Sequence, residues 1–259
     1  MYDTNDAVGL VARGLRAGWL LSVYPDAAEA GGCFRSTARP RGPGEWRPGG
    51  DPLAASERAA SEAARRARGK VRRYCAANRL NRLGTLTYRG AGCHDPRQVR
   101  SDAGRFFRRL RAALPAGAAL PYLWVPEWHA GGHGLHLHFA VGRFIRRSDI
   151  DAAWGHGFVH IKQLGDVRVG AGALGEARLA ARYLGKYVGK AMDERRVAGL
   201  HRYERAEGHD PRVVHVEGRS RDAVIAAASA RLGRDPERVW TSDDTEGWQG
   251  PPAVWVQWP

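Results

Sequence analysis

From residue 82 to residue 192 the sequence switches repeatedly between the two-residue period of a β-strand and the longer period of an amphipathic helix. Segments that alternate and favour strands are 82–88, 121–128, 135–141 and 157–164. Segments with helical spacing are 94–114, 147–155 and 174–192. The predicted order is therefore βαββαβ followed by one more helix.

This order predicts an α+β fold with a small ferredoxin/RRM-like antiparallel sheet and flanking helices, which we expect on one face of the sheet. The Gly-rich stretch HAGGHG separates 121–128 from 135–141, and such turn chemistry is typical of a hairpin. Two antiparallel neighbours in the sheet are thus predicted from local sequence alone.

Three parts are expected along the chain. Residues 1–52 form an N-terminal segment that ends in a basic linker, because 31–52 is rich in Gly, Pro and Arg. Residues 53–195 form the main domain, which starts with a long basic helix over 53–78. Residues 196–259 form an extension with one helix at 222–233 and a Trp-rich, irregular end packed on the main domain.

The charge balance points to a polyanionic partner. The chain of 259 residues has 41 Lys and Arg against 27 Asp and Glu, a formal net charge of +14. Residues 56–111 alone carry sixteen basic and four acidic side chains. A surface of this kind binds nucleic acid with a strong dependence on salt, so nucleic acid is the expected partner.

Cysteine spacing and hydropathy exclude other classes. The three cysteines, Cys33, Cys75 and Cys93, have no CxxC spacing, which argues against a disulfide framework or a cysteine zinc knuckle. No stretch approaches the roughly 18–20 apolar residues of a membrane span, and the first residues lack the pattern of a signal peptide. We expect a cytoplasmic protein without a membrane partner.

Two histidines in the strand 135–141 form a candidate metal site. His136 and His138 are two apart, so both imidazoles face the same side of the strand, opposite the apolar residues. Glu127 in the preceding strand is the candidate third ligand if the hairpin register allows it; His129 and His133 in the turn are alternatives. A site of mixed nitrogen and oxygen ligands suits Mn²⁺ or Mg²⁺. Two ordinary surface histidines would show the same pattern.

The helix segment ARYLGKYVGKAM contains two pairs at helical spacing. Tyr183 and Tyr187 lie on one stripe, and Lys186 and Lys190 lie on another. Half-buried tyrosines and solvated lysines are one interpretation. The other is that a tyrosine attacks a phosphodiester, which needs help at neutral pH because the phenol pKa is near 10. A metal and the lysines would supply that help.

Three stretches together carry a family resemblance. GTLTY at 84–88, HLHFAV at 136–141 and YLGKYVGK at 183–190 resemble the three motifs of HUH endonucleases, and specifically the two-tyrosine initiators of rolling-circle replication in phages, plasmids and actinobacterial mobile elements. The resemblance covers roughly residues 80–195. It implies an HUH endonuclease core, with His136 and His138 as metal ligands.

The resemblance also implies an activity. Tyr187 and Tyr183 would be the nucleophiles and Lys186 and Lys190 the motif lysines of an enzyme that nicks and rejoins origin DNA through a 5′-phosphotyrosine. The substrate would be single-stranded or hairpin origin DNA. The chain contains no GxxxxGK[ST] loop, so a host helicase, and a host polymerase, are expected partners.

Other functions remain open on the sequence. An HUH transposase or relaxase would share the metal and the tyrosine but act on transposon ends or a transfer origin. A non-enzymatic basic DNA-binding module would need neither, and a zinc hydrolase would need no tyrosine. Trp124, Trp128 and Trp154 are candidates for base stacking, although packing is the better explanation for the first two.

Overall fold

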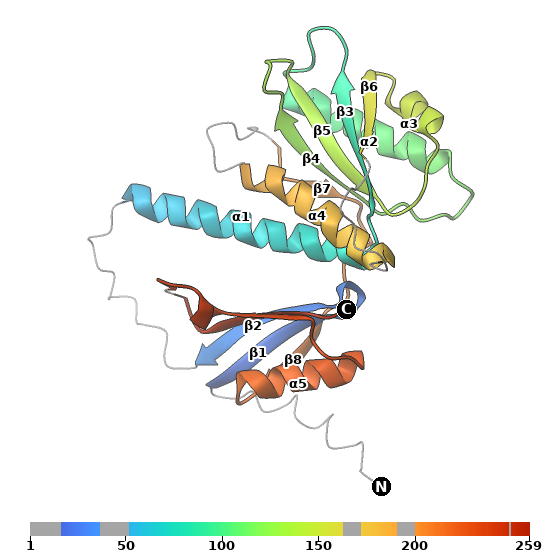
Figure 1. Ribbon diagram of the computed structural model, residues 1–259. Coiled ribbons are helices and arrows are strands. Elements are labelled where there is room, and N and C mark those ends of the chain that lie inside the picture. The colour runs from blue at the N-terminus through green and yellow to red at the C-terminus, as the bar shows by residue number, and fades with distance from the viewer. Residues whose placement is uncertain (1–16, 37–51, 163–171, 191–199, 249) are drawn as a thin grey trace. The chain divides into compact units, whose positions relative to one another are not determined.

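The computed structural model describes residues 17–36, 52–162, 172–190, 200–248 and 250–259 (Figure 1). The chain divides into two compact units. The larger lies within residues 50–211, and the smaller contains residues from both ends of the chain, 1–49 and 212–259. This division differs from the predicted boundaries at 52 and 195, because strands from the two ends pair with one another.

The helices and strands are, in chain order, β1 (Ala17–Tyr24), β2 (Glu29–Ser36), α1 (Pro52–Ala77), β3 (Arg82–Tyr88), α2 (Pro96–Ala112), β4 (Tyr122–Trp128), β5 (Leu135–Val141), α3 (Arg147–Trp154), β6 (Gly157–Lys162), α4 (Gly172–Lys190), β7 (Glu204–Arg205), β8 (Val214–Gly218), α5 (Arg221–Leu232), β9 (Arg238–Thr241) and β10 (Ala253–Gln257). Short 3₁₀ turns follow β1 and β9.

The smaller unit is an antiparallel sheet in the order β8-β1-β2-β10-β9, with α5 packed against β8 and β1. Its core includes Leu21, Val254 and Trp258, all buried. The prediction of an irregular linker is wrong for residues 31–36, which belong to β2, and the predicted irregular end contains β9 and β10. These short strands become recognisable only with their distant partners. Residues 1–16 and 37–51 lie outside the described part.

The larger unit contains the predicted βαββαβ order. Its antiparallel sheet runs β6-β3-β5-β4-β7, and the first four of these strands have the ferredoxin-like arrangement. The predicted α+β class is confirmed. The last predicted helix, 174–192, corresponds to α4; residues 191 and 192, and residues 163 and 164 of the predicted fourth strand, lie outside the described residues.

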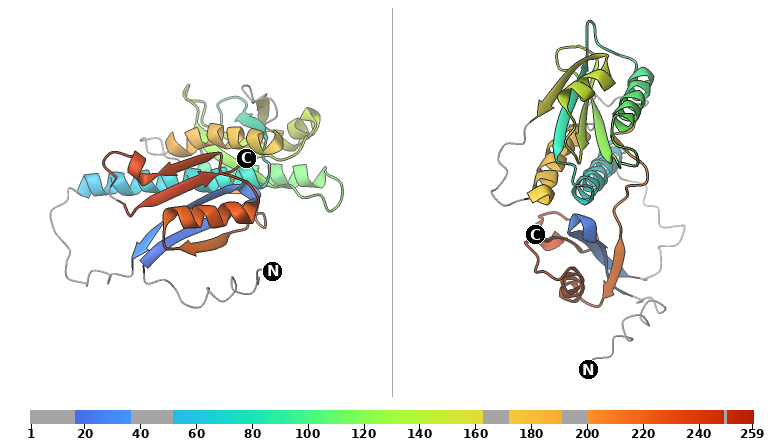
Figure 2. Two further views of the ribbon diagram at one scale, coloured as in Figure 1. Left: turned by 60° about the horizontal axis from the view of Figure 1, so that its bottom comes forward. Right: turned by 90° about the vertical axis from the view of Figure 1, so that its right-hand side faces the viewer.

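Helices cover both faces of this sheet, so the expectation of helices on one face is wrong. Phe106 of α2 and Trp154 of α3 pack on one face with Phe139 of β5. Val71 of α1 and Leu184 of α4 belong to a second core on the opposite face. The views in Figure 2 show α2 and α4 on opposite sides of the sheet.

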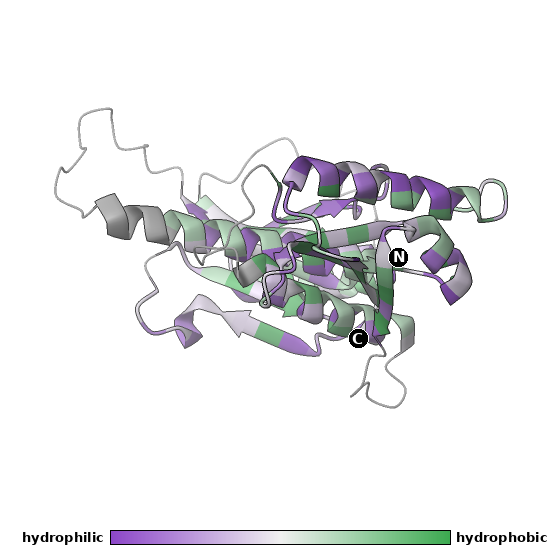
Figure 3. Ribbon diagram, turned by 90° about the horizontal axis from the view of Figure 1, so that it is seen from above, coloured by the Kyte–Doolittle hydropathy of each residue, from purple (hydrophilic) through white to green (hydrophobic). Residues whose placement is uncertain are grey.

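The sequence reason for the second core is that the strands carry apolar residues at both parities. Leu83 of β3, Leu123 of β4 and Ala140 of β5 all face α1 and α4. In Figure 3, green hydrophobic and purple hydrophilic segments alternate along the helices, which is typical of helices that bury one side. The face with His136 and His138 is therefore a covered surface.

Candidate metal and tyrosine site

The hairpin register brings three potential ligands together. Glu127 of β4 lies opposite His136 of β5, so both side chains point to the same face. The Oε2 atom of Glu127 is 2.9 Å from Nε2 of His136 and 2.8 Å from Nε2 of His138. The two Nε2 atoms are 3.1 Å apart. The three predicted residues thus form one cluster, and within the described residues the turn histidines His129 and His133 are not part of it.

The donor set of this cluster fits a divalent cation. Two imidazole nitrogens and one carboxylate oxygen are ligands that bind Mn²⁺, Mg²⁺ and related ions. Ligand atoms about 2.1 Å from a common ion and at right angles to one another are about 3 Å apart, which matches these separations. Glu127, His136 and His138 would hold the ion, and the remaining positions would be open to substrate.

A contact from β3 orients one ligand. The Nδ1 atom of His138 is 3.0 Å from Oγ1 of Thr85, which lies opposite His138 in the sheet. A hydrogen bond at Nδ1 holds the imidazole ring so that Nε2 faces the cluster. His138 is only 5% exposed, although the sequence alone placed it on the side away from the core. Thr85 belongs to the GTLTY stretch, and its contact explains part of that motif.

Helix α4 places both tyrosines beside the histidines. Ala180, Leu184 and Val188 are buried against the sheet, and this stripe fixes the rotation of the helix. The ring of Tyr187 stacks on His138 with centroids 3.8 Å apart and an interplanar angle of 13°. Tyr183, one turn earlier, lies edge-on to His138 at 6.1 Å. Both phenols therefore stand at the metal cluster.

The two phenols are linked directly. The hydroxyl of Tyr187 donates a hydrogen bond to the hydroxyl oxygen of Tyr183 across 2.7 Å. Burial, together with this hydrogen bond, raises the pKa of Tyr187 above its usual value near 10. Tyr187 is therefore a neutral phenol and a hydrogen-bond donor at neutral pH.

Two lysines approach Tyr183. The Nζ atom of Lys186 is 5.9 Å from the centre of the Tyr183 ring, and Nζ of Lys162, from β6, is 4.8 Å from it. Lys162 was not among the predicted site residues. Its pairing with Leu83 in the sheet shows that its side chain shares the face of Thr85, but that pairing is a property of the fold. Lys190 ends α4, and its side chain lies outside the described part.

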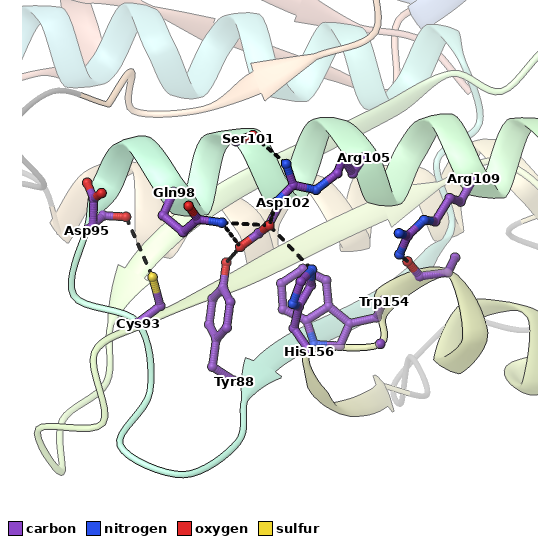
Figure 4. A network of polar contacts seen from close by, with 12 residues as sticks. Tyr88, Cys93, Asp95, Gln98, Ser101, Asp102, Arg105, Arg109, Trp154 and His156 are labelled. Carbon is purple, nitrogen blue, oxygen red and sulfur yellow. Dashed lines mark hydrogen bonds and ion pairs between the residues drawn. The ribbon is translucent and has the colours of Figure 1, made fainter.

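The other residues of GTLTY have structural roles. A side chain at Gly84 would meet the ring of Phe139, since an ideal Cβ there lies 2.4 Å from Cε1 and Cζ. Tyr88 donates a hydrogen bond of 2.9 Å to Asp102, which is only 1% exposed (Figure 4). Burial and this hydrogen bond raise the pKa of Tyr88. Gln98, Arg105 and His156 also contact Asp102, so this carboxylate ties α2 to β3.

Two of the three candidate stacking tryptophans are core residues. Trp124 and Trp154 are 2% and 0% exposed, so neither face of either indole is open to a base. Trp128 is half-buried and lies beside His94, with ring centres 6.0 Å apart. The packing explanation holds for Trp124, and base stacking by Trp154 is excluded.

The comparisons with known proteins identify the same region. Residues 81–192 match the model of a family of replication-associated proteins of the ORF2 type. No curated protein and no solved structure matches the chain significantly. The matched segment runs from β3 through α4 and includes the metal cluster and both tyrosines. The match supports a role in the initiation of replication, and hence DNA as a partner. None of the described helices is long and apolar enough to cross a membrane.

Proposed function

We propose that residues 53–195 form an HUH endonuclease with two tyrosine nucleophiles, which nicks and rejoins origin DNA to initiate rolling-circle replication. The observation that carries the proposal is the approach of α4 to β5. It brings the Tyr187 ring to 3.8 Å from His138, whose Nε2 is 2.8 Å from Glu127. A nucleophile and a metal site are what phosphodiester transfer to a tyrosine requires.

The chemistry is an exchange of one phosphodiester for another. The oxygen of Tyr183 or Tyr187 attacks phosphorus, the bond from phosphorus to the 3′ oxygen breaks, and the proton of the phenol passes through solvent to that leaving oxygen. The products are a 5′-phosphotyrosine and a free 3′-OH primer. A divalent cation held by Glu127, His136 and His138 would polarise the scissile phosphate.

The cationic groups and the second tyrosine complete the proposed cycle. Lys186 and Lys190 would stabilise the charge on the transferring phosphate. After one round of synthesis, the second tyrosine would cleave the new junction, and the freed 3′-OH would attack the first phosphotyrosine to close the strand. The 2.7 Å between the two hydroxyl groups allows both to serve the same site. A host helicase and polymerase in the cytoplasm would open and copy the duplex.

The test is formation of a covalent adduct. The chain is incubated with Mn²⁺ and 3′-labelled single-stranded DNA from the origin of its own element, and adducts are resolved on a denaturing gel. We expect an adduct that disappears with EDTA and in the Tyr183→Phe, Tyr187→Phe double variant. DNA binding without an adduct would contradict the proposal and favour a plain binding module. Adducts with transposon ends or a transfer origin, but not with a replication origin, would identify a transposase or relaxase.

A further inference from the structure

A second cavity opens at the end of the sheet where β5 and β6 end and β3 begins. Its volume is about 600 Å³, and its wall includes Asn81, Arg82, Arg143, Ile161 and Lys162. Arg82 lies opposite Val141 in the sheet, and Leu83 lies opposite Lys162, so the register itself brings these strand ends together. Neither the metal cluster nor the tyrosines line this cavity.

The wall of the cavity is strongly cationic. Arg82, Arg143, Arg147 and Lys162 all line it, against Glu176 as the acidic residue of the lining. Arg147 is engaged by Asp151 at 3.5 Å, and Glu176 accepts a hydrogen bond of 2.5 Å from Asn81. The remaining positive charge favours an anionic ligand with at least one phosphate.

Two polar atoms of the lining residues are buried without a partner in the described part of the chain. They are the acceptor Oδ1 of Asn81 and the donor Nε of Arg143. Buried polar groups in proteins are nearly always hydrogen-bonded, so a donor and an acceptor left open in one cavity indicate a ligand that offers both. The polar edge of a nucleobase has this property.

The cavity also has an apolar side. Phe144 lines it and is 72% exposed, and Ile161 is 37% exposed. An exposed aromatic ring beside positive charge is the combination that proteins use to bind single-stranded DNA, with a base on the ring and the backbone on the cations.

The cavity adjoins the tyrosine site through two elements. Lys162 lines the cavity, while its Nζ is 4.8 Å from the ring centre of Tyr183. Glu176 and Tyr183 both belong to α4, and the helix between their positions is about 10 Å long. That distance corresponds to about three stacked nucleotides. A strand with its scissile phosphate at Tyr183 could thus place a nearby nucleotide in the cavity.

We infer that this cavity, defined by Asn81, Arg143, Phe144 and Lys162, binds one nucleotide of the single strand that flanks the cleaved phosphate. The base stacks on Phe144 and pairs its polar edge with Asn81 and Arg143, and the phosphate faces Lys162. The inference rests on the proposed function, since it assumes that single-stranded DNA reaches Tyr183.

The test measures binding without cleavage. Fluorescence anisotropy in EDTA follows the full chain with a labelled oligothymidylate of about twelve nucleotides. A series of oligonucleotides with one abasic position each locates the base that occupies the cavity. Phe144→Ala is compared with Phe158→Ala, a matched control because Phe158 is 70% exposed on β6 but does not line the cavity. Circular dichroism checks that both variants are folded.

We expect Phe144→Ala to weaken binding about tenfold, and Phe158→Ala less than twofold. An abasic position that weakens binding by the wild-type chain should have no further effect on Phe144→Ala. Equal affinities of Phe144→Ala and the wild type, equal sensitivity to every abasic position, or no binding by the wild type would overturn the inference.

The outcome is separable from that of the proposed function. If Phe144→Ala loses binding but no adduct forms with Mn²⁺ and origin DNA, the nuclease proposal fails and the cavity remains a nucleotide site. If the adduct forms and Phe144→Ala binds normally, the cavity assignment alone fails.

Discussion

The hydroxyl groups of Tyr187 and Tyr183 lie 2.7 Å apart, with Tyr187 as the donor, although the two residues are a full helical turn from each other. Because both oxygens occupy the same place beside His138, either could reach one phosphate with little rearrangement of the site. This arrangement would allow one tyrosine to hold the cleaved strand while the other begins the next transfer.

We therefore expect Tyr183→Phe and Tyr187→Phe each to retain adduct formation with origin DNA, and the double variant to lose it by more than about a thousandfold. Tyr187→Phe removes one hydrogen bond from Tyr183, a loss of about 1 kcal/mol that corresponds to about fivefold in rate. Adduct yield on denaturing gels over time provides the measurement. Complete loss in one single variant would instead identify one obligatory nucleophile.

Thr85→Val tests the orientation of the metal ligand. The change keeps the shape of the side chain but removes the Oγ1 that lies 3.0 Å from Nδ1 of His138. We expect the affinity for Mn²⁺ to fall about tenfold or more, measured by isothermal titration calorimetry. Thr87→Val is the matched control, since Thr87 lies opposite Phe158, away from the cluster. Equal losses in both variants would indicate a general effect on β3.

Gly84→Ala tests the close packing of β3 on β5. The added Cβ would lie 2.4 Å from two ring carbons of Phe139, a core residue, so the ring must move. We expect the free energy of unfolding to fall by about 1–3 kcal/mol in urea denaturation.

Gly104→Ala is the control for this change. Gly104 lies inside α2, where an added Cβ meets only the end of the flexible Arg108 side chain at 3.3 Å. Alanine in a helix interior should raise the stability by about 0.5–1 kcal/mol. A stable Gly84→Ala variant would show that the Phe139 ring can relocate at little cost.

Tyr88→Phe tests the contact with Asp102 through pH. Burial, followed by the hydrogen bond to Asp102, raises the pKa of Tyr88 in the folded chain. Above about pH 10 the unfolded chain loses this proton first, so ionisation favours unfolding and stability falls as the pH rises. At neutral pH the variant should lose about 1 kcal/mol with the hydrogen bond.

Urea denaturation between about pH 8 and pH 11 provides the measurement for this prediction. The stability of Tyr88→Phe should decline less steeply with pH than that of the wild type, because one raised tyrosine pKa is absent. Parallel declines would contradict a raised pKa at Tyr88.

Local sequence was sufficient for much of the larger unit and for half of the site. The strand and helix periods predicted βαββαβ, because each period is a property of neighbouring residues. The two-residue period also placed His136 and His138 on one face, and helical spacing placed Tyr183 and Tyr187 on one stripe. These relations hold in any fold that keeps the elements.

Relations between elements were decided only by the tertiary structure. Hairpin register, which the turn sequence left open, determines that Glu127 faces His136. The packing of α4 over the histidines depends on a second core that the expected one-sided sheet did not include. The pairing of β1 with β8 joins residues nearly two hundred positions apart, and Lys162 reaches Tyr183 from a different strand. Such contacts arise from burial shared among distant segments, and no local period encodes them.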